Sequence, residues 1–219
     1  MRVALIPMKE LAQAKMRLAD VLERAGRAEL ALAMLTDVVA ACHDSGCFHR
    51  VTVVSNDGEA LRYAAELGAT PLAEPAALGG LNESLAFGQR HAGGRDGVDE
   101  LVILPADAPL VRAEDLRAVI DALAGAPGPR AVLVRSRDNG TNALALRPPD
   151  AIGMHFGRNS ADAHRAAAEA AGIAVVELVN ERLAYDIDAP EDLEALPGLA
   201  VGAATRGWLE ARAHYAAER

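Results

Sequence analysis

The sequence predicts a single α/β domain over residues 1–219, in which a mixed, mostly parallel sheet is covered by helices on both faces. Short apolar runs alternate with helical patterns almost from end to end, and no repeat, linker or low-complexity tract divides the chain. Strands without polar residues are typical of parallel sheets that are buried on both sides. A chain of this length can bury one sizeable core.

The expected strands are the short apolar runs. In chain order they cover residues 3–7, 51–55, 101–104, 131–134, 142–146 and 174–178. Asp138, Asn139 and Gly140 form a turn signal between the fourth and fifth runs. That turn is compatible with an antiparallel pair, which would make the sheet mixed.

The expected helices lie between these strands. They cover residues 22–42, 58–67, 83–91, 113–123 and 160–171, and a last helix begins near Pro190. Gly68 is placed to end the second helix, and Glu114 and Asp115 suit the positive N-terminal end of the fourth. The alternation of strand and helix is thereby nearly continuous.

Composition and charge exclude several classes of protein. The chain is 51% hydrophobic and carries a net charge of −9, which argues against disorder and against nucleic-acid or anionic-membrane partners. No apolar run reaches transmembrane length, and the chain opens into a strand rather than a signal peptide. Cys42 and Cys47 lack a C-x-x-C pattern and are expected to be free thiols in a reducing compartment. These features predict a cytoplasmic protein and leave its oligomeric state open.

Ligands of such sheets bind beyond the carboxyl ends of the strands, so function is sought there. The segment after the first strand lacks both the G-x-G-x-x-G pattern and a P-loop, which argues against a dinucleotide-dependent oxidoreductase. It carries instead three cations, Lys9, Lys15 and Arg17. Cations at this place would offset the charge of a leaving pyrophosphate, although a solvated basic start to a helix explains them equally.

A second unusual segment contains Gly79, Gly80, Leu81 and Asn82. The glycines permit a close approach of the backbone to a flat ligand, and the Asn82 amide offers a donor and an acceptor to a base or ribose edge. The alternative is that Asn82 caps the helix that follows. Both interpretations are compatible with a nucleotide site.

Aspartates follow two further segments. Asp107 comes directly after the apolar run 101–104 and lies between two prolines, and Asp186 and Asp188 alternate on a short extended stretch. Carboxylates gathered at strand ends suit a divalent cation that also binds phosphate oxygens. The alternatives are a turn residue for Asp107 and a helix cap before Pro190 for Asp188.

Together these segments resemble a known family. IPMKELAQAKMRL, GGLNESL, PADAPL, GTNAL, FGRNS and DIDAPEDL occur in this order over nearly the whole chain. The chain is similar to the phosphoenolpyruvate and 2-phospholactate guanylyltransferases of deazaflavin coenzyme (F-420) biosynthesis, a branch of the MobA-like nucleotidyltransferases. PADAPL and DIDAPEDL identify only the superfamily, and the other motifs narrow the resemblance. Met16 and Ala189 stand where this family usually has Ser and Thr.

The resemblance implies a transfer of GMP from GTP to a small phosphorylated acid, with release of pyrophosphate. Phosphoenolpyruvate is the first candidate acceptor, and 2-phospholactate and 3-phosphoglycerate are the others. Two alternatives stay open. A molybdenum-cofactor guanylyl- or cytidylyltransferase usually carries an L-x-G-G-x-x-x-R-M-G loop that is absent here, and a non-catalytic nucleotide-binding module is the second.

The resemblance also implies roles for individual residues. Mg²⁺, or else Mn²⁺, is expected on Asp107 with Asp186 or Asp188, and Lys15 and Arg17 would act on the leaving pyrophosphate. The nucleotide is expected near the positions Pro7, Lys9, Gly80, Leu81 and Asn82, and the acid near Thr141, Gly157 and Ser160. Among the last three, the Ser160 hydroxyl is expected to donate to the acid, with Thr141 and Gly157 contributing mainly backbone N–H groups.

Overall fold

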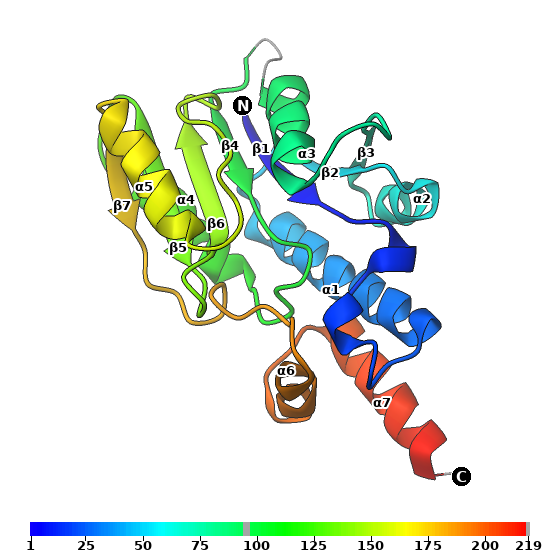
Figure 1. Ribbon diagram of the computed structural model, residues 1–219. Helices are drawn as coiled ribbons and strands as arrows, with labels where there is room; N and C mark the ends of the chain where they lie inside the picture. Colours follow the sequence, from blue (N-terminus) through cyan, green and yellow to red (C-terminus); the bar gives the residue numbers. More distant parts are fainter. Residues whose placement is uncertain (94–96, 218–219) are drawn as a thin grey trace.

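A computed structural model describes residues 1–93 and 97–217, and one seven-stranded sheet runs through it (Figure 1). The order of the strands across the sheet is β3-β2-β1-β4-β6-β5-β7. Their bounds are β1 Arg2–Pro7, β2 Arg50–Ser55, β3 Thr70–Ala73, β4 Glu100–Ile103, β5 Arg130–Arg135, β6 Thr141–Arg147 and β7 Ala174–Glu177. Each of the six expected strands is present within one or two residues of its predicted bounds.

The sheet is mixed, as the turn at Asp138–Gly140 predicted. β6 runs antiparallel to both of its neighbours, β4 and β5, whereas the other pairs are parallel. The pairing of β5 with β6 is irregular between Val134 and Arg135, immediately before the turn that joins the two strands. Because of this reversal, Thr141 lies at the first position of β6, at the same edge of the sheet as the carboxyl ends of the parallel strands.

Helices cover both faces of the sheet (Figure 1). Their bounds are α1 Arg24–Ser45, α2 Gly58–Glu66, α3 Leu81–Gly88, α4 Ala113–Ala124, α5 Ser160–Ala170, α6 Pro190–Ala195 and α7 Ala203–Ala217. One core cluster joins the sheet to α1, α2 and α4, and a second joins its other face to α3 and α5. The predicted fold class is confirmed.

The packing of α3 is close. An added Cβ at Gly88 would lie 2.7 Å from a methyl carbon of Leu5 on β1, so only glycine lets the helix approach the sheet this far. The helix begins at Leu81, two residues earlier than predicted, and continues as a π-helical turn over Gln89–Gly93. Its first turn is thereby fixed beside the end of β1.

Among the strands and α-helices of the described residues, β3 and α7 are the two that the sequence did not predict. β3 is a short edge strand with mostly exposed residues, including Pro71. α7 packs against α1, and the backbone N–H groups of Ala204 and Thr205 donate to the Asp37 carboxylate on α1, at 2.9 and 3.0 Å. The carboxylate thus serves as the cap of a helix that lies far along the chain.

Two further expectations concern the membrane and the thiols. Within the described ranges, none of the helices combines the length and the apolarity that crossing a bilayer requires. Cys42 is buried, Cys47 is partly buried, and both are free thiols.

Candidate active site

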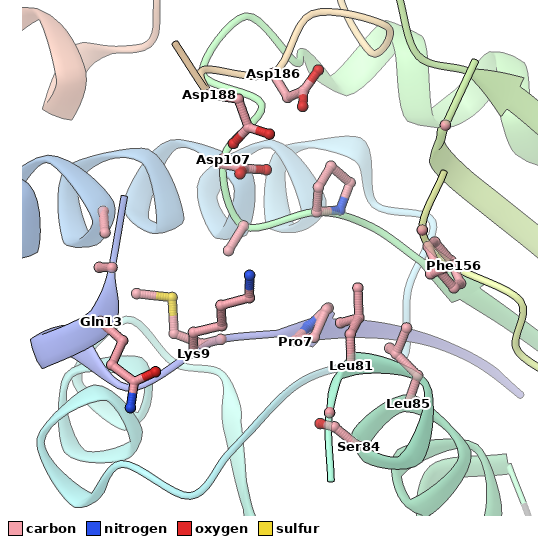
Figure 2. A pocket seen from close by; sticks show the side chains of 18 of the residues that line it. Pro7, Lys9, Gln13, Leu81, Ser84, Leu85, Asp107, Phe156, Asp186 and Asp188 are labelled. Carbon is pink, nitrogen blue, oxygen red and sulfur yellow. The ribbon is translucent and has the colours of Figure 1, made fainter. Parts of the chain in front are cut away.

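A cleft of about 940 Å³ opens at the carboxyl ends of the parallel strands. All of the residues to which the sequence assigned a role line this cleft, except Asn82. Figure 2 shows Asp107, Asp186 and Asp188 together on one side, with Leu81, Ser84 and Leu85 across the pocket from them. The topology therefore brings together segments that are up to 181 positions apart, from Pro7 to Asp188.

The three aspartates come from two loops. Asp107 follows β4, and Asp186 and Asp188 lie in the irregular segment before α6. The Ile187 backbone N–H donates to the Asp107 carbonyl at 3.3 Å, which holds the two loops together. The aspartates do not form a ready-made cage, since the described residues include no group of three or more His, Cys, Asp or Glu side chains arranged to hold a metal ion.

Lys15 lies among these carboxylates. Its ammonium donates to Asp107, to the Ile187 carbonyl and, at 3.2 Å, to Asp188. Burial acts to lower the pKa of Lys15, but the charges of Asp107 and Asp188 and the hydrogen bonds to them outweigh it and raise the pKa. The sequence placed Lys15 among three cations on the loop after β1, and the structure seats its ammonium inside the aspartate cluster; its action on a leaving pyrophosphate stays a prediction.

Asp186 lies in a different environment from its neighbours. It accepts a hydrogen bond from the Asn142 amide at 3.2 Å. Burial, together with the nearby negative charge of Asp107, raises the pKa of Asp186 to about 6. A cation close to this carboxylate would therefore be strongly favoured, because it would replace the solvation that the ionised form has lost.

Asp188 does not cap α6. The Asp192 carboxylate accepts from the backbone N–H groups of Asp188 and Ala189, both at 2.9 Å, and so caps the helix from within. This removes the capping alternative for Asp188, whose carboxylate bonds instead to Lys15 and, at 3.3 Å, to Arg17. Asp188 thus lines the cleft with its carboxylate paired to two cations.

We call Pro7, Lys9, Glu74, Gly80 and Leu81 the glycine wall of the cleft. Gly80 has a φ of 151°, a value that strongly favours glycine, and Lys9 is exposed with its side chain pointing into the pocket (Figure 2). Glu74 follows β3, and its Oε2 is buried without a hydrogen-bond partner in the described part of the chain. Glu74 lines the cleft, but Oε2 itself is shielded from solvent, so a ligand donor would reach it after a rotation of the side chain, and its lack of a partner would favour that contact.

Asn82 is the one predicted site residue that faces away from the cleft. Its amide donates to the Phe156 carbonyl at 2.8 Å, and its carbonyl oxygen accepts from the Phe156 N–H at 2.7 Å. It does not cap α3 either, because Gly80 precedes the first turn. The side-chain amide of Asn82 is thereby engaged within the protein and holds the first turn of α3 against the segment around Phe156, and its place near the base or ribose stays a prediction.

We call Thr141, Gly157 and Ser160 the hydroxyl wall. Thr141 opens β6, Ser160 opens α5, and the Ser160 hydroxyl donates to Thr141 Oγ1 at 3.0 Å. The Ser160 backbone N–H donates to the Gly157 carbonyl at 3.1 Å. Ser160 therefore does not cap α5 with its side chain, and its polar groups are already engaged within the wall.

Two cleft-side residues were not singled out from the sequence in these roles. Glu74 follows β3, a strand that the sequence did not reveal, and His164 lies behind the hydroxyl wall with its Nδ1 3.0 Å from Thr141 Oγ1. The only available signals were a carboxylate near a Gly-Gly pair and a histidine one helical turn after Ser160. Neither pattern points to a particular chemistry without the fold.

The chain is similar to known proteins whose names are consistent with the geometry of this site. A profile of the family described as "Guanylyl transferase CofC like" matches residues 1–211. A phosphoenolpyruvate guanylyltransferase of Sphaerobacter thermophilus is 42% identical over 205 residues, which cover 93% of this chain and 96% of that protein. Another from Rubrobacter xylanophilus is 43% identical over 88% of this chain and 92% of its own.

Solved structures share the fold at low sequence identity. A putative nucleotide-diphospho-sugar transferase from Desulfovibrio desulfuricans has a TM-score of 0.77 at 19% identity, covering 97% of this chain and 95% of its own. A nucleotidyl transferase from Methanothermobacter has a TM-score of 0.65 at 17% identity, with 90% and 95% covered. These likenesses show the nucleotide-diphospho-sugar transferase type of fold.

Proposed function

Because the chain belongs to the family of CofC-like guanylyltransferases, we propose that it transfers GMP from GTP to a small phosphorylated acid, with phosphoenolpyruvate as the first candidate. The observation that carries the proposal is one cleft in which the aspartate cluster meets the hydroxyl wall and the glycine wall. The product would be a guanylylated acid anhydride for deazaflavin coenzyme assembly.

In the proposed reaction, a phosphate oxygen of the acid attacks the α-phosphorus of GTP. One P–O bond forms there, the bond from the α-phosphorus to the bridging oxygen breaks, and pyrophosphate leaves with the electron pair. The attacking phosphate is already ionised, so the reaction needs no general base. Catalysis is then chiefly positioning and stabilisation of charge.

The aspartates fit a divalent cation by their donor chemistry. Mg²⁺ prefers oxygen ligands and is usually held by one or two carboxylates together with substrate phosphates, so a complete protein cage is not required. Asp107 with Asp186 or Asp188 would hold Mg²⁺ or Mn²⁺, and the ion would supply positive charge to the phosphate oxygens. Lys9 is an exposed cation of the cleft, and Arg17, also exposed, is paired with Asp188 at 3.3 Å. Both would act on the leaving pyrophosphate, as Lys15 would from within the aspartate cluster.

Glu74 supports guanine as the base. The Watson–Crick edge of guanine presents N–H donors at N1 and N2, which a carboxylate accepts together, whereas adenine presents an unprotonated N1 at the same place. The unpartnered Oε2 of Glu74 lies in the wall that carries Gly80 and Leu81. The Glu74 carboxylate would therefore favour GTP over ATP.

The proposal is tested with the purified chain, Mg²⁺ and each pairing of GTP or ATP with phosphoenolpyruvate, 2-phospholactate or 3-phosphoglycerate. Released pyrophosphate is measured, and the product is identified by mass. We expect the guanylylated phosphoenolpyruvate to predominate and a chelator to abolish its formation until Mg²⁺ or Mn²⁺ is restored. Turnover only with another acid would change the acceptor. Binding of GTP without turnover on any acid would favour a non-catalytic module.

A further inference from the structure

His164 is a buried titratable residue that the proposed reaction does not use. It lies on α5, and its exposed fraction is 1%, as is that of Ser160. Both of its ring nitrogens have partners: the His155 backbone N–H at 3.0 Å from Nε2, and Thr141 Oγ1 at 3.0 Å from Nδ1. Because this buried imidazole contacts a residue of the cleft, the direction of its hydrogen bonds determines what that residue can offer a ligand.

The His155 contact fixes the tautomer of His164. A backbone N–H can only donate, so Nε2 must present its lone pair and carry no proton. Burial, together with the neighbouring His155, lowers the pKa of His164 to about 4, so the ring is neutral. The single N–H proton of the neutral ring is then on Nδ1, so this nitrogen cannot accept the Thr141 proton and can only donate, to the oxygen of Thr141 and to the backbone carbonyl of Ser160 one helical turn earlier.

The Thr141 hydroxyl therefore receives two hydrogen bonds. His164 Nδ1 donates to its oxygen, and the Ser160 hydroxyl donates to it as well, at 3.0 Å. A hydroxyl has two lone pairs and one proton, so both acceptor positions are filled and only the proton is left. Thr141 lines the cleft, and that proton is the one group of the hydroxyl still able to bond a ligand.

We propose that His164 is a positioning residue that makes the Thr141 hydroxyl an obligatory hydrogen-bond donor toward a carboxylate or phosphate oxygen of the acceptor acid. The inference rests on the proposed function. It reverses the expectation from the sequence, in which Ser160 donates to the acid, because the Ser160 proton is already given to Thr141. A donor that cannot turn into an acceptor selects anions and rejects ligands that present N–H or O–H groups.

His164 also secures the other part of the hydroxyl wall. Its Nε2 accepts from the N–H of His155, and the next residue, Phe156, is held by Asn82. Gly157 follows directly, so the same imidazole holds the strand residue Thr141 and the approach to Gly157 at a fixed separation. Loss of the ring should therefore disturb binding of the acid more than binding of the nucleotide.

The first test compares variants of the two partners. Thr141→Val keeps the shape and removes the hydroxyl, whereas Thr141→Ser keeps the hydroxyl. We expect Thr141→Val to raise the KM of the acid by about tenfold or more, the effect of losing one charge-assisted hydrogen bond, with the KM of GTP within about twofold of the wild type. Thr141→Ser should restore most of the loss, and Ser160→Ala should have a smaller effect than Thr141→Val.

The second test is a double-mutant cycle between His164→Phe and Thr141→Val. Phenylalanine preserves the edge-on ring contact with Phe156, at 4.8 Å between centroids, but makes neither hydrogen bond. If His164 acts through the Thr141 hydroxyl, the double variant should raise the KM of the acid no more than the worse single variant does. His155→Ala is the matched control, since it keeps the backbone N–H and removes an exposed ring from the same segment.

The outcomes separate this inference from the proposed function. Multiplicative effects of the two substitutions, or a lower melting temperature of His164→Phe with an unchanged KM for the acid, would overturn the role of His164. So would a larger loss for Ser160→Ala than for Thr141→Val. Failure of the wild-type chain to consume GTP with any phosphorylated acid would instead contradict the proposed function itself.

Discussion

At the hydroxyl wall the side chains are buried and bonded to one another, whereas at the glycine wall Lys9, Gly80 and Leu81 lie exposed. The hydroxyl wall sits on regular elements, at the starts of β6 and α5, and its hydrogen-bond directions are set before any ligand arrives. The glycine wall is mostly loop, and its one buried acceptor, on Glu74, is unsatisfied in the described residues. A preorganised wall suits discrimination between small acids that differ by few atoms, and an open wall suits the entry of a large nucleotide.

The largest expected effect is at the aspartate cluster, which lies in the same cleft as both walls. Asp107→Asn keeps the size of the side chain but removes its charge, so turnover should fall by about a hundredfold or more. Asp121→Asn, on the exposed face of α4, is the charge-matched control and should leave turnover unchanged. Unchanged turnover of Asp107→Asn, with the fold intact by circular dichroism, would remove Asp107 from the site.

A substitution at Gly157 tests how rigid the hydroxyl wall is. Gly157 has a φ of 133°, which a branched side chain adopts only with strain, although an added Cβ would meet no atom within 4 Å. Gly157→Val should therefore raise the KM of the acid by roughly ten- to a hundredfold through the distorted turn, and Gly157→Ala should do so less. Initial rates over a range of acid concentrations measure both. Equal rises in the KM of GTP would show that the two walls are not distinct.

A substitution at Glu74 tests the open wall. Glu74→Gln exchanges the carboxylate for an amide that both donates and accepts, so one of the two guanine N–H groups loses its partner. We expect the preference for GTP over ATP, measured as the ratio of kcat/KM values, to fall by about tenfold. The KM of the acid should stay as it is. A preference that survives the substitution would place the base elsewhere in the cleft.

The smallest expected effect concerns pH and the hydroxyl wall. His164 titrates at about 4 in the fold and near 6.5 when unfolded, so the unfolded chain binds more protons between these values. The free energy of unfolding therefore falls as the pH drops from about 6.5 toward about 4. From pH 7 to pH 5, the Tm of the wild type should decrease by about 4–8 °C more than that of His164→Phe.

The neighbouring His155 supplies the control for that measurement, because it is the other imidazole that faces His164. His155→Ala should retain most of the pH dependence of the wild type. Parallel Tm profiles of the wild type and His164→Phe would show that the ring is not held neutral in the fold.

The sequence predicts most of the fold because periodicity is a local property. The apolar runs of β1 and β4 and the turn at Asp138–Gly140 report directly on burial and on strand reversal. β3 was not predicted because an exposed edge strand has no apolar pattern. α7 was not predicted because the residue that caps it, Asp37, is 167 positions away in the chain. Contacts between residues far apart in the chain produce no periodic pattern in the sequence.

The same limit applies to the candidate site. The loop that carries Asp107 follows a predicted strand, and the loop that carries Gly80 is marked by its pair of glycines, so both could be located from the sequence, but the partners of individual side chains could not. Lys15 meets carboxylates 92 and 173 positions away, and the amide of Asn82 turns to Phe156 at a separation of 74 positions. Such pairings depend on the order of strands in the sheet, which local patterns do not determine.

The paired hydrogen bonds of Asn82 have a thermodynamic consequence. They join the first turn of α3, beside the glycine wall, to the segment that leads into Gly157. If nucleotide binding shifts α3, these bonds pass the shift to the site of the acid as a coupling free energy, and coupling is reciprocal. If GTP raises the affinity for the acid by some factor, the acid raises the affinity for GTP by the same factor, whichever ligand binds first.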